Sequence, residues 1–119
     1  MTKVLIVDDS LFARIQLRKL LESNGFDVID EAENGQVALR KIQELRPDLV
    51  TLDITMPEMD GLECMQEIKK MDHIPMVIMI SALGQEVYVQ QAILNGAKGF
   101  IVKPFKNEEL IKNLNKYKL

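Results

Sequence analysis

Short, nearly continuous apolar runs alternate along this chain with longer segments in which apolar residues recur every three or four positions. Runs such as 3–7 and 76–80 are aliphatic at almost every position, which is typical of parallel strands buried on both faces. The longer segments have the spacing of amphipathic helices. The expected strands are 3–7, 26–31, 48–52, 76–80 and 100–102.

Capping and turn residues mark the helices expected between these strands. Ser10 is expected to cap the first helix, and Gly25 suits the position just after its carboxyl end. Asn34-Gly35 should begin the second helix, which continues to about residue 45, and Asn107 is expected to cap the last helix. The third and fourth helices are expected at about 61–71 and 85–94.

Strict alternation of strands and helices predicts parallel βαβ units with right-handed crossovers and helices on both faces of one sheet. The fold class is therefore α/β, a flavodoxin-like, doubly wound (βα)5 arrangement of five parallel strands. The strand order 2-1-3-4-5 follows from the general rule for this class. No linker or low-complexity segment divides the chain, so one domain covering residues 1–119 is expected.

Charged and hydroxyl residues stand at the carboxyl ends of four of the predicted strands. Asp8 and Asp9 follow the first strand, Asp53 the third, Ser81 the fourth and Lys103 the fifth. In a doubly wound sheet these ends share one rim, and ligands bind where the strand order reverses, between strands one and three. The sequence therefore predicts that three acids, a hydroxyl and an ammonium group converge there.

The residue types in this predicted cluster favour phosphoryl transfer. Three neighbouring carboxylates repel one another, and a hard divalent cation such as Mg²⁺ or Mn²⁺ relieves that repulsion. Asp53, alone on the middle strand, can serve both as a metal ligand and as a nucleophile. With Lys103 and Ser81 available to hold phosphoryl oxygens, the expected product is an acyl phosphate on Asp53.

Composition narrows the setting of this chemistry. The net charge of −3 gives no attraction to nucleic acid or to an anionic membrane, and no apolar run approaches the length of a membrane span. With no signal-peptide pattern at Met1, we expect a cytoplasmic protein that neither inserts into membranes nor binds DNA directly. The single cysteine, Cys64, is expected to pack in the core.

Four motifs occur in order at these strand ends: Asp8-Asp9, LDITMPEMDG at 52–61, MISALG at 79–84 and FIVKPF at 100–105. Together they resemble the receiver domain of two-component response regulators, in particular the stand-alone chemotaxis regulators of the CheY type. The resemblance covers essentially the whole chain. Each motif alone is weak, but four in the right order are specific.

The resemblance implies a role for each residue of the cluster. Asp53 matches the phosphoacceptor, and Asp8 and Asp9 match the acidic pair that binds Mg²⁺, with Mn²⁺ as an alternative ion. The backbone carbonyl of Thr55 matches the remaining protein ligand of the metal, and Lys103 matches the lysine that binds the phosphoryl group.

The resemblance also implies a switch. Ser81 matches the switch hydroxyl and Phe100 the switch aromatic, at positions where threonine and tyrosine are the commoner residues. Leu83 is apolar where the family often has a polar residue that orients water, so the lifetime of the acyl phosphate is left open.

The implied function is a signalling switch, not an enzyme that turns over a substrate, although the chain assists its own phosphorylation and dephosphorylation. A histidine kinase of the CheA type is the expected phosphodonor. The reader of the signal is expected to be a protein such as a motor switch component, with a phosphatase as a further candidate partner. The regulator is expected to act as a monomer, and its expected output surface comprises the fourth helix, the fifth strand and the fifth helix.

Three alternatives remain open on the sequence. The chain could be a receiver excised from a longer regulator with an output domain. A haloacid-dehalogenase type of phosphatase also uses an aspartate nucleophile, but it needs a second aspartate where Thr55 stands. A flavodoxin-type cofactor binder would need phosphate-binding donors after the first strand, where Asp8 and Asp9 would repel a phosphate.

Overall fold

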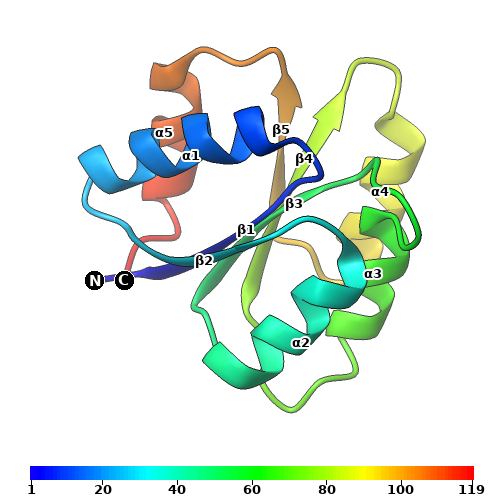
Figure 1. Cartoon of the computed structure of the whole chain (residues 1–119). Coiled ribbons are helices and arrows are strands. Elements are labelled where there is room, and N and C mark those ends of the chain that lie inside the picture. The colour runs from blue at the N-terminus through cyan, green and yellow to red at the C-terminus, as the bar shows by residue number, and fades with distance from the viewer.

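The structure is a computed structural model and describes all residues, 1–119. Five strands alternate with five helices, as the hydrophobic pattern predicts (Figure 1). The strands are β1 (Lys3–Val7), β2 (Asp27–Ala32), β3 (Leu49–Asp53), β4 (Met76–Ala82) and β5 (Gly99–Lys103). The helices are α1 (Leu11–Ser23), α2 (Gly35–Leu45), α3 (Gly61–Ile68), α4 (Glu86–Leu94) and α5 (Asn107–Asn115).

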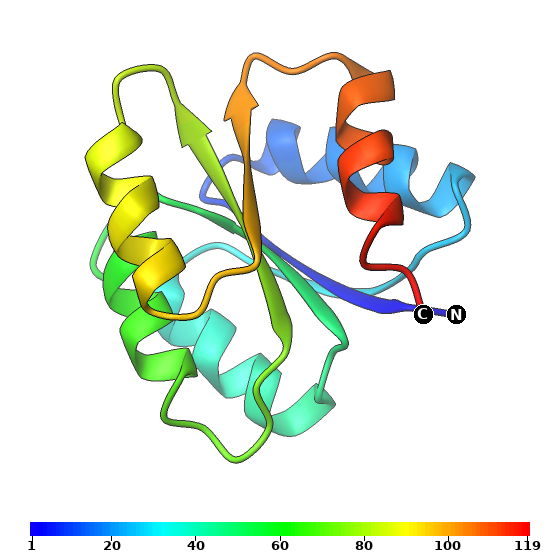
Figure 2. The same cartoon turned by 180° about the vertical axis from the view of Figure 1, so that it is seen from behind.

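All strand pairs are parallel, and the sheet order is β2-β1-β3-β4-β5, which confirms the predicted flavodoxin-like topology. Helices α1 and α5 cover one face of the sheet, and α2, α3 and α4 cover the other (Figures 1 and 2). The order reverses at β1, so β1 and β3 are neighbours although α1, β2 and α2 separate them in sequence. Their carboxyl ends border the switch point of the sheet.

Two hydrophobic clusters, one on each face of the sheet, explain why the strands are apolar at consecutive positions. In β1, Val4 and Ile6 belong to the cluster under α1 and α5, whereas Leu5 and Val7 belong to the cluster under α2, α3 and α4. Successive side chains of a strand point to opposite faces, so both sets must be apolar when both faces are covered. Cys64 is fully buried in the second of these clusters, as expected for a packing residue.

Two helix boundaries differ from the predictions. Asn107 was expected to cap α5, but it is the first helical residue, and Lys106 occupies the cap position with no side-chain hydrogen bond. Helix α3 was expected to reach about residue 71 but ends at Ile68, because the N–H groups of Lys70 and Met71 bond to carbonyls three residues back in a turn. Neither difference moves a residue of the predicted cluster.

No helix of the structure is both long enough and apolar enough to cross a membrane.

Candidate functional site

The acid pair follows β1 directly. Asp8 is almost fully buried and Asp9 is exposed. The carboxylate of Asp8 accepts a hydrogen bond from the Ser10 N–H at 2.9 Å, and its backbone carbonyl accepts one from the Arg14 guanidinium at 2.7 Å. Ser10 itself caps α1 by accepting from the Ala13 N–H, as predicted. The start of α1 therefore fixes the loop that carries both acids.

Asp53 is the last residue of β3 and has only 8% of its surface exposed. The loop after it returns tightly, because the Gly61 N–H donates to the Ile54 carbonyl at 2.7 Å. A side chain at position 61 would place its Cβ 2.3 Å from the Asp53 carbonyl oxygen, so only glycine fits there. Asp60 then caps α3 by accepting from the Glu63 N–H at 2.8 Å, which explains the Asp-Gly pair of the motif.

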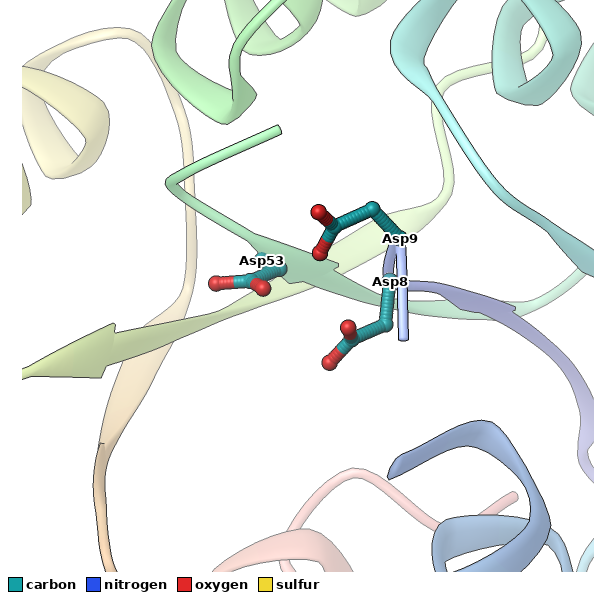
Figure 3. A group of neighbouring side chains, drawn as sticks. All are labelled: Asp8, Asp9 and Asp53. Atoms are coloured by element: carbon teal, nitrogen blue, oxygen red, sulfur yellow. The ribbon is translucent and has the colours of Figure 1, made fainter. Parts of the chain in front are cut away.

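The structure brings the three acids together. Carboxylate oxygens of Asp8, Asp9 and Asp53 lie within 4.8 Å of one another at the ends of β1 and β3 (Figure 3). All three groups offer hard oxygen ligands, which is the donor set that Mg²⁺ and Mn²⁺ prefer. The exposure of Asp9 leaves the cluster open to solvent on one side. These residues therefore fit a divalent cation of this class.

Lys103, at the end of β5, supplies the positive charge of the site. Its Nζ lies 3.0 Å from Asp8 Oδ2 and 3.5 Å from Asp53 Oδ2, and its side chain is one-third exposed. Burial opposes its charge, but the hydrogen bond to Asp8 and the charge of Asp53 outweigh burial and raise the pKa of Lys103. The ammonium ion therefore stays charged between two acids.

The environment of Asp53 disfavours the ionised form of its side chain. Burial raises the pKa of Asp53 to about 6, against the lowering effect of Lys103, and the charges of Asp8 and Asp9 raise it further. A hydrogen bond from the backbone of Thr55 favours the charged form but does not cancel these effects. Clustered acids that oppose each other's charge are more common at functional sites than at structural ones.

Ser81 and Phe100 lie beside this cluster, not within it. Ser81 is buried near the end of β4, one residue after Ile80, which pairs with Asp53. A pocket of about 280 Å³ is lined by Ser81, Val89 and Phe100 among others. Phe100 is 50% exposed on β5, so it is a surface residue at the edge of this pocket.

One residue at the site has no signal in the sequence. The side chain of Gln85 donates to the Thr55 hydroxyl at 2.8 Å and accepts from the Ala82 N–H at 2.6 Å. Glutamine carries no charge and belongs to none of the strand-end motifs, and its contacts depend on how two loops approach each other in space. The predicted role of the Thr55 backbone carbonyl as a metal ligand stays a prediction.

Known proteins are similar to this chain over nearly its whole length. The family model for the response regulator receiver domain matches residues 4–115. The chemotaxis protein CheY of Bacillus subtilis is 51% identical over 114 residues, which cover 96% of this chain and 95% of that protein. The chemotaxis protein CheY of Thermotoga maritima is 48% identical over the same shares of the two chains.

A solved structure agrees with these relatives. The CheX–CheY complex with BeF3 and Mg²⁺ from Borrelia burgdorferi contains a chain that matches 99% of this one over 90% of its own length, with 43% identity and a TM-score of 0.91. Receiver domains of the CheY kind are phosphoacceptor switches and not turnover enzymes. The acidic cluster, the strand order and these matches together show that the chain belongs to the response regulator receiver domain family, among its CheY-type members.

Proposed function

We propose that this receiver is a switch of a chemotaxis system in which Asp53 accepts a phosphoryl group from a histidine kinase of the CheA type. The observation that carries the proposal is the placement of Asp53. It is a nearly buried carboxylate at a strand end, 3.5 Å from Lys103 Nζ and grouped with Asp8 and Asp9. The naming of the relatives as chemotaxis proteins supports the assignment to chemotaxis.

Mg²⁺ is the proposed ion of the site, and Mn²⁺ has the same ligand preference. Asp8, Asp9 and Asp53 would hold it with carboxylate oxygens, together with the Thr55 backbone carbonyl. A cation bound there would supply positive charge that offsets the negative charge of the transferred phosphoryl group. The Mg²⁺ in the matching complex from Borrelia burgdorferi supports this ion.

In the proposed reaction a carboxylate oxygen of Asp53 forms a bond to phosphorus, and the bond from phosphorus to the donor breaks. With a phosphohistidine donor the leaving group is an imidazole, which retains the electron pair of the broken bond and takes up a proton from solvent. Lys103, already between Asp8 and Asp53, would turn its ammonium group to a phosphoryl oxygen. Ser81 would donate its hydroxyl to another such oxygen.

We further propose that α4, β5 and α5 form the surface that a protein partner reads, such as a motor switch component. Val87 and Tyr88 on α4 and Phe100 on β5 are large hydrophobic residues that are exposed to solvent. Their exposed fractions are 63%, 51% and 50%. Movement of Ser81 toward the phosphoryl group would leave room in the pocket beside it for Phe100.

A phosphatase is also proposed as a partner, because the matching CheY chain is complexed with CheX.

The docking of the kinase has a candidate place beside the site. Leu11, Phe12 and Ile15 on α1 are exposed apolar residues, and a groove lined by Phe12 and Ile15 is also lined by Lys103. A protein phosphodonor bound in this groove would be next to the acids that follow β1. The regulator itself is proposed to be a monomer.

Intact-mass spectrometry with acetyl phosphate as donor tests the function. The wild type should gain the mass of one phosphoryl group in Mg²⁺ and gain none in EDTA. Asp53→Asn should gain none in either buffer, because it lacks the nucleophile. Asp72→Asn, an exposed acid of the loop before β4, is the matched control and should behave as the wild type. Phosphorylation of Asp53→Asn, or equal phosphorylation of the wild type in EDTA, would show that the acceptor or the metal is wrongly assigned.

A further inference from the structure

Gln85, which follows β4, joins the end of that strand to the loop after Asp53. Its side-chain amide donates to the Thr55 hydroxyl in the loop after β3 and accepts from the N–H of Ala82, the last residue of β4. The two distances, 2.8 and 2.6 Å, are those of well-formed hydrogen bonds. We name this pair of hydrogen bonds the Gln85 bridge.

The two anchors of the Gln85 bridge are close in sequence to residues of the phosphorylation site. Thr55 follows Asp53 by two residues, and its backbone hydrogen-bonds to the Asp53 carboxylate. Ala82 follows Ser81 on β4, the strand that pairs with β3 next to Asp53. The two anchors of the bridge therefore belong to the two neighbouring segments that carry Asp53 and Ser81.

The bridge uses a side chain that would otherwise be available to cap α4. Gln85 occupies the N-cap position of α4, yet it makes no side-chain hydrogen bond to the N–H groups of that helix. The preceding Gly84 has a φ of +89°, and no atom lies within 4 Å of the position that a Cβ would take. No neighbouring group therefore packs against this side of Gly84. The Gln85 amide therefore links the start of α4 to the loop that follows Asp53.

We propose that Gln85 is a positioning residue that holds the unphosphorylated state and releases both anchors when Asp53 carries a phosphoryl group. This inference rests on the proposed function, in which Asp53 is the acceptor. A phosphoryl oxygen is a charged acceptor and competes for the Ala82 N–H better than a neutral amide carbonyl does. Release of Ala82 also loosens the Gln85 side chain, which then gives up its contact with the Thr55 hydroxyl, and with it the first turn of α4, so the site and the proposed output helix change together.

The bridge has a kinetic consequence. If its hydrogen bonds must break before the phosphoryl oxygens can take their place, they add to the barrier for phosphorylation. Each net hydrogen bond of this kind changes an equilibrium by about two- to tenfold. Removal of the bridge should therefore speed phosphorylation by about three- to tenfold.

Gln85→Met removes the amide and keeps the length of the side chain, and Gln91→Met, at an exposed position on α4, is the matched control. Quenched time courses with acetyl phosphate, read by intact mass, should show faster phosphorylation for Gln85→Met and an unchanged rate for Gln91→Met. The affinity for Mg²⁺ should be the same in Gln85→Met and wild type, whereas general loosening of the site would weaken it. The Ala82 amide NMR signal should move on addition of beryllofluoride to the wild type and should already be displaced in Gln85→Met.

A second variant keeps the test decisive if Gln85→Met folds poorly. Thr55→Val removes the hydroxyl that accepts from Gln85, and it should speed phosphorylation by a smaller factor. The double variant should be no faster than Gln85→Met alone, because both changes break one bridge. Rates at the wild-type level in both single variants, or effects that multiply in the double variant, would overturn the inference. If the wild type itself gains no phosphate, the proposed function fails as well; if only the rates are unchanged, the proposed function stands.

Discussion

The position of Asp53 destabilises the charged form of its side chain. Its pKa is about 6 in the folded chain, above the ordinary value of 3.8, mainly because burial opposes ionisation. The folded chain therefore binds a proton on Asp53 more tightly than the unfolded chain does. It follows that Asp53 destabilises the fold progressively as the pH rises from about 4 to about 6, and fully above that range.

The first stability prediction is that Asp53→Asn is more stable than the wild type at pH 8 in EDTA, and equally stable near pH 4. A pKa difference of about two units corresponds to about 3 kcal/mol, which is the largest gain expected. Urea denaturation at several pH values measures it. Asp72→Asn should show no such dependence on pH, and a constant difference between Asp53→Asn and the wild type would contradict the assigned environment.

The sequence was enough to place Asp53 at a strand end but not to give its environment. An apolar strand followed by an acid and an Asp-Gly turn predicts the location. The pKa of about 6 is the balance between burial, which raises it, and Lys103, which lowers it from 3.5 Å away on a strand 50 residues further along the chain. Local patterns do not encode distances of that kind.

Among the elements, α4 and β5 border the pocket that contains Ser81. Phe100 is 50% exposed, and the pocket behind it reaches Ser81. A two-state equilibrium in which Phe100 turns into this pocket would alter the surface of both elements. Phosphorylation could shift that equilibrium only by binding one of the two states better than the other.

We predict that Ser81→Ala accepts a phosphoryl group from acetyl phosphate but transmits a weaker signal. The variant keeps Asp53 and loses the hydroxyl that would move toward the phosphoryl oxygens. Amide NMR shifts with and without beryllofluoride should change less over residues 87–102 than they do in the wild type. Wild-type changes over those residues would show that the signal does not pass through Ser81.

At this scale the hydrophobic pattern predicted every helix and strand, while boundaries and loop contacts depended on the tertiary structure. Asn107 has the side chain of a good cap, yet the chain enters α5 one residue earlier, at Lys106, whose extended backbone suits the cap position. The Gln85 bridge was not predictable, because it needs the loops after β3 and β4 to meet. The strand order was correct because a general rule for doubly wound sheets applied.

For the molecule as a whole, we expect the cluster of acids to couple the stability of the fold to divalent cations. A cation that binds only the folded chain stabilises it by mass action, by about 2.7 kcal/mol when its free concentration is 100 times its dissociation constant. Mg²⁺ should therefore raise the melting temperature of the wild type. Asp9→Asn should show a much smaller rise, because it removes one of the three carboxylates.

Thermal denaturation over a series of Mg²⁺ concentrations checks this prediction. Asp27→Asn is a suitable control, because Asp27 is an exposed acid at the amino end of β2, away from the cluster. It should respond to Mg²⁺ as the wild type does. An equal response in Asp9→Asn would place the ion elsewhere on the molecule.

The two ends of the chain lie side by side, as both overall views show (Figures 1 and 2). The backbone N–H of Leu119 donates to the Thr2 hydroxyl at 2.7 Å, at the amino end of the sheet and away from the acids that follow β1. A short linker could therefore join the ends, with new ends opened at the exposed Asp72 in the loop between α3 and β4. In such a circular permutant Lys103 would precede Asp8 and Asp53 along the chain and still meet them in space. The chemistry of this receiver depends on where the strands lie in the sheet, and the order in which they are synthesised is free to change.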